Sequence, residues 1–180
     1  MKVAVDAIVF GYDREKGVSL LLIKRKYTPY KGNWAIPGGF VKNEENLENA
    51  VHRELKEETS IEIDYLEQLY SFGEIDRDPR ERIISIAYFG LVQSNHFLKL
   101  KATTDAADAS WFNIKKLPKL AFDHKTIINS AINRLRNKIQ YQPIGFELLD
   151  EKFPFSDLEK LYSTLLDRPI DRRNFKKKVT

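Results

Sequence analysis

Three glutamates on one predicted helix place the strongest constraint on this chain. Apolar residues recur at helical intervals from Asn46 to Thr59, which predicts an α-helix packed on a core. Glu54, Glu57 and Glu58 fall at positions i, i+3 and i+4 and therefore share one face. Like charges at this spacing destabilise an isolated helix by on the order of tenths of a kcal/mol per pair, whereas bound Mg²⁺ would reverse that sign. From the spacing alone, a metal site and an ordinary solvated Glu- and Lys-rich face both remain open.

The apolar pattern on either side of this helix predicts an α/β protein. Runs rich in β-branched and aromatic residues, bounded by turn residues, predict strands at residues 3–12, 19–26, 61–72, 83–92 and 110–112. Asp123 is expected to cap a second amphipathic helix that ends near Ile139. Before the glutamate helix, Gly38 and Gly39 indicate a close backbone approach or a positive φ angle.

The composition restricts the setting in which the chain works. Its 180 residues correspond to one full domain with an appendage, and 42% hydrophobic residues are enough for a core. No apolar run approaches the roughly 20 residues that a membrane-spanning helix needs. There is no cysteine, and the net charge of +4 is modest. We therefore expect a cytoplasmic protein with no membrane partner, in which only a local cluster of basic residues would point to nucleic acid.

The segment from Gly39 to Ile61 resembles the Nudix box, G-x5-E-x7-R-E-U-x-E-E-x-G-U with U an aliphatic residue. Every specified position matches with its spacing intact except Ser60, which replaces the last glycine. The resemblance implies the Nudix αβα sandwich with a mixed sheet. It also implies that Gly38 and Gly39 let the loop pass beside a metal ion. Ser60 removes no metal ligand, but a residue with a Cβ adopts the left-handed conformation at a helix end at a cost of about 1 kcal/mol.

The same resemblance implies roles for the charged residues of the box. Glu54, Glu57 and Glu58 would bind Mg²⁺ or Mn²⁺, and Arg53 and Glu45 would orient the helix and its loop through an ion pair. Nudix enzymes hydrolyse nucleoside diphosphates linked to another group. That chemistry needs a metal ion to neutralise pyrophosphate oxygens and activate the attacking water.

The carboxylate that accepts the proton of the attacking water is less well defined. Glu54 is one candidate, and Asp105 and Asp108 in the loop from Lys101 to Ser110 are two others. The alternative is that Asp105 and Asp108 are turn and cap residues before the next strand.

Two arginines occupy the charged loop between the third and fourth long strands. Guanidinium groups such as those of Arg77 and Arg80 suit bidentate contact with phosphate, which makes both candidates for substrate binding. A solvated connection with internal ion pairs is the alternative. Together with Arg82 and the strand that follows, the loop resembles Nudix proteins that recognise ADP-ribose or related sugar nucleotides.

The last forty residues predict a small helical unit after a linker at residues 141–145. Ser156 begins an S-x-x-E capping box before a helix that extends to Leu166, and Asp171 can cap a final helix. In that final helix Phe175 and Val179 face inward. The residues that face outward are basic: Arg172, Arg173, Lys176 and Lys177. A solvated basic tail is the alternative to a DNA-binding surface.

The segment Leu166–Lys178, together with Phe122-Asp123-His124, is similar to the NrtR family of Nudix-related transcriptional regulators. These proteins join a Nudix-like sensor to a winged helix-turn-helix and are understood to release DNA when an effector binds. We therefore expect a Nudix domain at residues 1–140 and a helix-turn-helix-like segment at 141–180, without the wing strands because the chain stops at Thr180.

Two functional hypotheses follow from these resemblances. The first is a Mg²⁺-dependent pyrophosphohydrolase that cleaves ADP-ribose or a related nucleotide sugar into two monophosphates. The alternative is a regulator that binds double-stranded DNA and uses the Nudix domain as a sensor of that ligand. Similarity to both groups implies a homodimer.

Overall fold

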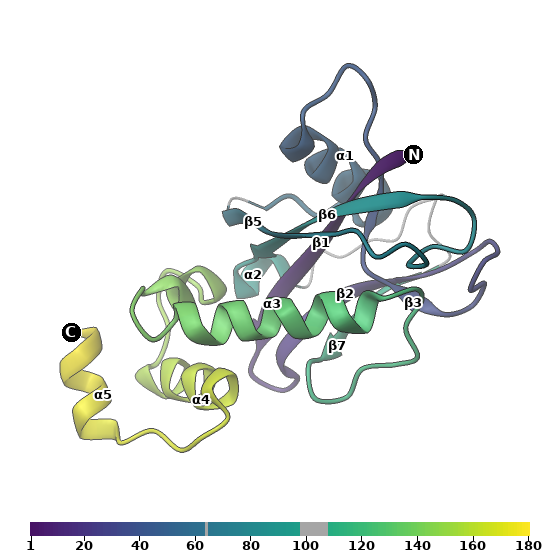
Figure 1. Ribbon diagram of the computed structural model, residues 1–180. Coiled ribbons are helices and arrows are strands. Elements are labelled where there is room, and N and C mark those ends of the chain that lie inside the picture. The colour runs from purple at the N-terminus through teal and green to yellow at the C-terminus, as the bar shows by residue number, and fades with distance from the viewer. Residues whose placement is uncertain (64, 98–107) are drawn as a thin grey trace.

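A mixed β-sheet with helices on both faces forms the body of the molecule (Figure 1). The computed structural model describes residues 1–63, 65–97 and 108–180. In chain order the elements are β1 (Lys2–Asp13), β2 (Gly17–Lys24), β3 (Trp34–Ala35), β4 (Gly38–Phe40), α1 (Leu47–Thr59), β5 (Tyr65–Phe72), β6 (Ile83–Leu91), α2 (Ser94–Phe97), β7 (Asp108–Asn113), α3 (His124–Lys138), the 3₁₀ helix η1 (Ile144–Leu148), α4 (Phe155–Leu166) and α5 (Arg172–Val179). None of the helices in these described ranges is long and apolar enough to cross a membrane.

Strand β1 is the centre of the sheet. The strand order is β3-β2-β1-β6-β5, with β4 paired to β1 and β7 paired to β2. The β1–β6 pair is parallel, with Val5 opposite Ile86, and the other pairs are antiparallel. Such a strand is covered on both faces, which explains its nearly continuous apolar sequence. Ile8 and Phe10 belong to one core cluster, whereas Val9 between them belongs to the other.

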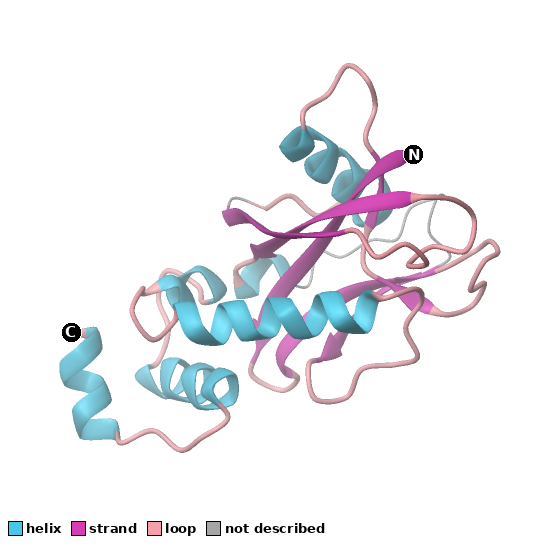
Figure 2. Cartoon of the chain, in the orientation of Figure 1, coloured by secondary structure: helices cyan, strands magenta, loops and turns pink. Residues whose placement is uncertain are grey.

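One helix covers each face of this sheet, as Figure 2 shows. The apolar stripe of α1, which includes Ala50, Val51 and Leu55, packs in the cluster that contains Val9. The stripe of α3, which includes Ile127 and Leu135, packs in the opposite cluster. The αβα sandwich with a mixed sheet that the sequence predicts is therefore confirmed.

The C-terminal helices share the core of the sandwich. Leu158 and Leu165 of α4 and Phe175 of α5 belong to the same hydrophobic cluster as the inner face of α3. Arg136 of α3 also donates from Nε to the carbonyl of Leu165 at 2.6 Å. The expected linker at 141–145 is partly wrong, because Ile144 begins η1 and is itself buried in this cluster.

Three local predictions are corrected by the structure. The capping box at Ser156 is wrong: α4 begins one residue earlier, after Pro154, and has no side-chain cap. Pro154 has no backbone N–H to donate, and its fixed φ suits the start of a helix. The helix therefore begins directly after Pro154, and Ser156 lies inside its first turn. Asp123 precedes α3 without capping it, and the strand expected from residue 61 begins at Tyr65. The Asp171 cap is confirmed, since its carboxylate accepts from the Asn174 N–H at 3.0 Å.

The end of α1 adopts the conformation that glycine favours. Ser60 has φ 60° and ψ 15°, and its N–H donates to the carbonyl of Lys56 at 3.1 Å. A residue with a Cβ is strained in this left-handed region. Ser60 therefore keeps the usual helix ending at an energetic cost.

We expect Ser60→Gly to raise the free energy of unfolding by about 1 kcal/mol, because glycine adopts positive φ without that strain. Urea denaturation monitored by circular dichroism measures the change. The flexibility of glycine in the unfolded chain offsets part of the gain. An unchanged or lower unfolding free energy would show that Ser60 is not strained.

Candidate functional site

Arg53 holds the acidic face of α1 together. Its Nε donates to Oε2 of Glu45 at 2.9 Å, and its Nη1 donates to Glu54 at 2.7 Å and to Glu57 at 3.3 Å. Its Nη2 donates to the carbonyl of Phe40, which ties the loop after β4 to the helix. The hydrogen bond from Arg53 and one from the Lys42 N–H lower the pKa of Glu45 to about 2. The Arg53–Glu45 ion pair thus fixes the loop against α1, as the sequence resemblance implies.

Gly38 and Gly39 allow the carboxylates of Glu58 and Glu54 to lie close to the backbone of β4. The Gly38 N–H donates to Oε2 of Glu58 at 3.0 Å. A Cβ on Gly39 would clash with the carboxylate of Glu54, and one on Gly38 would clash with the carbonyl of Val5. Neither glycine has a positive φ, so of the two explanations that the sequence leaves open, close backbone approach is the correct one.

Burial makes these carboxylates electrostatically unfavourable. Desolvation, with a smaller contribution from the charge of Glu54, raises the pKa of Glu58 to about 8. Desolvation also raises the pKa of Glu54, although the hydrogen bond from Arg53 opposes it. Two partly buried acids of like charge at one helix face provide a place where a cation would be stabilised.

The donor chemistry of this face fits a hard divalent cation, because Glu54, Glu57 and Glu58 offer only carboxylate oxygens. In the present arrangement Nη1 of Arg53 occupies oxygens of both Glu54 and Glu57. Within the residues that the structure describes, no three acidic, histidine or cysteine side chains are gathered closely enough to hold an ion. The carboxylates are therefore suitable ligands for a divalent cation, but in this structure the charge of Arg53 neutralises Glu54 and Glu57.

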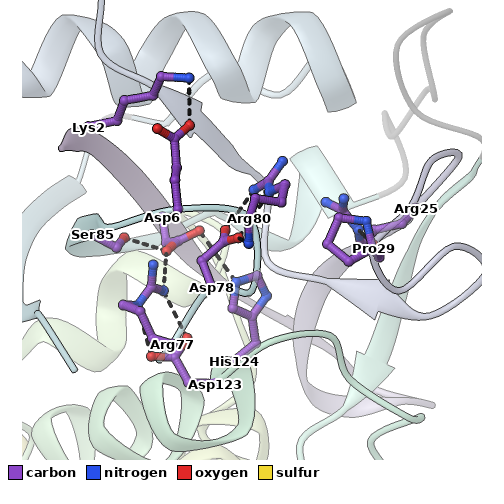
Figure 3. Close-up of polar contacts among 11 residues, drawn as sticks. Lys2, Asp6, Arg25, Pro29, Arg77, Asp78, Arg80, Ser85, Asp123 and His124 are labelled. Carbon is purple, nitrogen blue, oxygen red and sulfur yellow. Dashed lines mark hydrogen bonds and ion pairs between the residues drawn. The ribbon is translucent and has the colours of Figure 1, made fainter. Parts of the chain in front are cut away.

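A buried polar cluster lies beside this helix, and Figure 3 shows its members. Arg77 donates to Asp123 from Nε at 3.0 Å and from Nη2 at 2.8 Å, and its Nη2 lies 3.8 Å from Asp6. Asp6 of β1 also accepts a hydrogen bond from the Ser85 hydroxyl of β6. His124 completes the group, with Nε2 at 3.7 Å from Asp6. We call Asp6, Arg77, Ser85, Asp123 and His124 the Asp6 cluster.

His124 is neutral in this cluster. Its Nδ1 accepts from the Ile36 N–H at 3.0 Å, which assigns the ring proton to Nε2 on the side of Asp6. Burial lowers the pKa of His124. His124 is therefore a buried, neutral member of the cluster and not a surface residue. The sequence offered only its place in the segment 122–124, since its partners lie far away along the chain.

A cavity of about 150 Å³ opens between the Asp6 cluster and Glu58. Three arginines line it: Arg25, Arg77 and Arg80. Gly38 and Gly39, Asp78, Phe122 and the polar groups of Asp6 and His124 complete most of its polar and aromatic wall. Arg80 donates to Asp78 from Nε at 3.0 Å and from Nη2 at 2.7 Å.

Of the residues singled out from the sequence, five line the cavity: Gly38, Gly39, Glu58, Arg77 and Arg80. Arg53, Glu54 and Glu57 lie on the same helix as Glu58 but outside the lining of the cavity. Arg77 and Arg80 both line the cavity, but each already has a carboxylate partner. Asp105 lies outside the described residues, and the described part of Asp108 is its backbone in β7. Sequence reasoning missed Arg25 and Phe122, because one basic residue after an apolar strand and one aromatic residue before a helix are common features.

The final helix presents a basic face at the other end of the molecule. Asp171 caps α5, Phe175 is buried, and the basic side chains that precede and follow Phe175 are exposed. Arg172 lies 3.3 Å from Glu159, and Lys178 donates to the carbonyl of Gln140. The other exposed cations of α5 are Arg173, Lys176 and Lys177. Within the described residues, none of these three forms an ion pair with an acidic side chain.

These features place the chain in the Nudix family: residues 1–131 match the model of the NUDIX domain. The C-terminal helices add a second assignment, because residues 145–180 match the NrtR DNA-binding winged helix domain.

Relatives of two kinds resemble the chain. An ADPR-responsive transcriptional repressor of Acinetobacter baylyi is 32% identical over 179 residues, which cover 97% of this chain and 70% of that protein. An ADP-ribose pyrophosphatase of Methanocaldococcus jannaschii is 47% identical over 126 residues, which cover 70% of each chain.

Solved structures of one regulator resemble the chain over its whole length and over its Nudix part. Shewanella oneidensis NrtR superposes with a TM-score of 0.88 at 31% identity, over 99% of this chain and 84% of that one. That regulator has also been solved with a 27mer DNA, at a TM-score of 0.86, 31% identity and coverage of 98% and 81%. Its NUDIX domain has been solved with ADP ribose, at a TM-score of 0.68, 32% identity and coverage of 75% and 88%.

We expect Arg77→Gln to lower the free energy of unfolding by about 3–5 kcal/mol, because it leaves Asp123 and Asp6 without their buried counter-charge. Chemical denaturation measures this loss. Arg82→Gln is the matched control: Arg82 is exposed and donates to the Gly73 carbonyl, so its loss should change stability by about 0.5 kcal/mol or less. Equal effects of the two substitutions would contradict a structural role for Arg77.

Proposed function

We propose that this chain hydrolyses the diphosphate of ADP-ribose or a closely related nucleotide sugar. The observation that carries the proposal is the cavity in which Glu58 and the two glycines of β4 face three arginines. One of the three glutamates proposed for metal-assisted hydrolysis thus lines the same cavity as the cations proposed for the diphosphate. The match to the NUDIX domain and the ADP-ribose pyrophosphatase relative support this substrate class.

In this proposal the residues of α1 hold the metal ion and position the reaction. Glu54, Glu57 and Glu58 would bind Mg²⁺ or Mn²⁺, and the bound ion would supply charge neutralisation at the phosphate oxygens and a more acidic water. Arg53 keeps the acidic face and the loop after β4 in register through its bonds to Glu45 and Phe40. Water adds to one phosphorus while the bridging oxygen leaves on the other, so the products are two monophosphates. Glu54, Asp105 and Asp108 are candidates for the group that accepts the proton of that water.

We expect Glu57→Gln to lower turnover of ADP-ribose with Mg²⁺ by at least about 100-fold, because it removes one charged metal ligand. Release of AMP, followed by chromatography, measures turnover. Glu48→Gln is the control, since Glu48 is an exposed acid in the first turn of the same helix. Thermal unfolding should be nearly the same for both variants. If Glu57→Gln retained full turnover, the metal assignment would be wrong.

A second function is favoured by the basic face of α5. Its exposed residues Arg172, Arg173, Lys176 and Lys177 lie on a segment that matches a DNA-binding winged helix domain. We propose that residues 141–180 bind double-stranded DNA through these cations, with the Nudix domain as the sensor of ADP-ribose. The repressor relative and the regulator solved with DNA support this proposal. A homodimer would present two copies of α5 to a two-fold symmetric site.

We expect the combined substitution of Arg172, Arg173 and Lys176 by Gln to weaken binding to a labelled random-sequence duplex and to flatten its salt dependence. Each lost phosphate contact should reduce the slope of log K against log salt by about 1. Fluorescence anisotropy at several salt concentrations measures both quantities.

The control triple is Lys116, Lys119 and Lys125 to Gln, which removes the same formal charge from exposed positions near the start of α3. It should leave the slope nearly unchanged. Equal losses in the two triple variants would mean that net charge, and not the face of α5, determines binding.

A further inference from the structure

The three arginines of the cavity differ in how their charge is neutralised. Arg77 is buried and uses one edge of its guanidinium on Asp123, with Asp6 nearby. Arg80 makes a two-point contact with Asp78. Arg25 has no carboxylate partner within ion-pair distance in the described ranges, although its side chain is half-buried. Arg25 is therefore the cavity arginine whose charge is not already matched.

The backbone around Arg25 holds its guanidinium in place. Its Nε donates to the carbonyl of Pro29 at 2.8 Å, and its own N–H and carbonyl are bonded to Asn33 and Gly32 at 2.9 Å each. Among the described residues, neither Nη nitrogen of Arg25 has a hydrogen-bond acceptor. In Figure 3 the guanidinium points toward the side of the cavity on which Arg80 and Asp78 lie. A guanidinium that is held in place through its Nε, and whose Nη nitrogens have no acceptor among the described residues, is preorganised to bind an anion.

The Phe122 ring contacts two of the cavity arginines. The central carbon of the Arg25 guanidinium lies 4.8 Å from the centre of the Phe122 ring, and that of Arg80 lies 5.5 Å from it. Tyr30 packs edge-on against the same ring at 4.8 Å. Phe122 has φ 49°, a conformation that costs a residue with a Cβ free energy. The surrounding contacts hold the ring where it faces both cations.

The electrostatics of the pair also favour an anion. Burial, and then the neighbouring charge of Arg80, lower the pKa of Arg25. An arginine nevertheless stays protonated at neutral pH. Arg25 and Arg80 lie against the same aromatic ring, and within the described residues only Arg80 of the two has a carboxylate partner. The charge of Arg25 is therefore the one that an anion would neutralise.

We propose that Arg25 is the residue that binds the diphosphate of the nucleotide sugar, and that Phe122 is its positioning residue. Arg77 then has a structural role, because Asp123 and Asp6 already neutralise its charge. The inference rests on the proposed function, since it names the group in the same cavity that recognises the ligand. The volume of about 150 Å³ is below the roughly 300–1,000 Å³ of pockets that enclose a whole drug-sized ligand. The cavity therefore suits the diphosphate portion, with the rest of the ligand outside it.

Isothermal titration calorimetry without added metal tests the proposal, with ADP-ribose and inorganic pyrophosphate as probes. We expect Arg25→Gln to weaken binding of both by about 10- to 100-fold, the effect of losing one charge-assisted contact. Arg25→Lys should lose less, because it keeps the charge but not the fork. Arg82→Gln, outside the cavity, should bind both probes as the unchanged protein does.

The positioning role of Phe122 has its own readout. Phe122→Leu should weaken pyrophosphate binding while Phe122→Tyr, which keeps a ring face for the guanidinium, restores it. Thermal unfolding of each variant reports any loss of fold separately from the loss of affinity. Equal affinities of the Leu and Tyr variants would remove Phe122 from the proposal.

The outcomes separate this inference from the proposed function. Failure of the unchanged protein to hydrolyse ADP-ribose with Mg²⁺ would overturn the proposed function, while pyrophosphate binding that depends on Arg25 would still support the anion site. If the unchanged protein hydrolyses ADP-ribose but binds neither probe without metal, or if Arg25→Gln binds both probes as well as the unchanged protein does, the inference alone is overturned. Failure of both hydrolysis and probe binding would overturn both.

Discussion

The buried contact of Arg77 with Asp123 and Asp6 is the interaction on which the rest of the site depends. It joins the loop after β5 to the central strand and to the residue before α3, and Ser85 and His124 extend it to β6 and, through the Ile36 N–H, to the turn before β4. A buried ion pair adds little net stability over an apolar core, but removal of one partner is costly. The Asp6 cluster therefore serves mainly to fix where these elements meet, and the cavity lies against it.

A single helix connects this cluster with the C-terminal unit. α3 starts at His124, inside the Asp6 cluster, and near its end Arg136 bonds the last turn of α4 while Gln140 accepts from Lys178 of α5. Its apolar stripe packs in the cluster that also contains Leu165 and Phe175. The wall of the cavity and the basic face are thus attached to opposite ends of one packed element, without a flexible linker between them.

Local sequence patterns predicted the parts of the site that local interactions build. The stripe of α1 and the Asp171 cap follow from such patterns, whereas the Arg53–Glu45 pair is implied by the resemblance to the Nudix box. Each depends on residues within about two turns of one another or on one short loop. The partners of Arg77 and Arg25 could not be predicted in this way. Asp123 follows the usual pattern of a helix cap, yet its carboxylate binds Arg77, 46 positions away, because a buried guanidinium without a counter-charge would cost more than an uncapped helix. Such choices are made by tertiary burial, which no short window of sequence contains.

Hydrolysis and sensing make different demands on the same cavity. Both require affinity for the diphosphate, but a sensor needs the ligand to remain intact for longer than it stays bound, whereas an enzyme needs charged carboxylates free to hold a metal ion. Arg53 bears on this difference, because its Nη1 bonds Glu54 and Glu57 and neutralises part of the charge that a cation would use. A metal ion bound by these carboxylates would compete with Arg53 for their oxygens. The cationic side of the cavity meets this network at Phe40. The central carbon of the Arg80 guanidinium lies 5.8 Å from the centre of the Phe40 ring, and the Phe40 carbonyl accepts a hydrogen bond from Nη2 of Arg53.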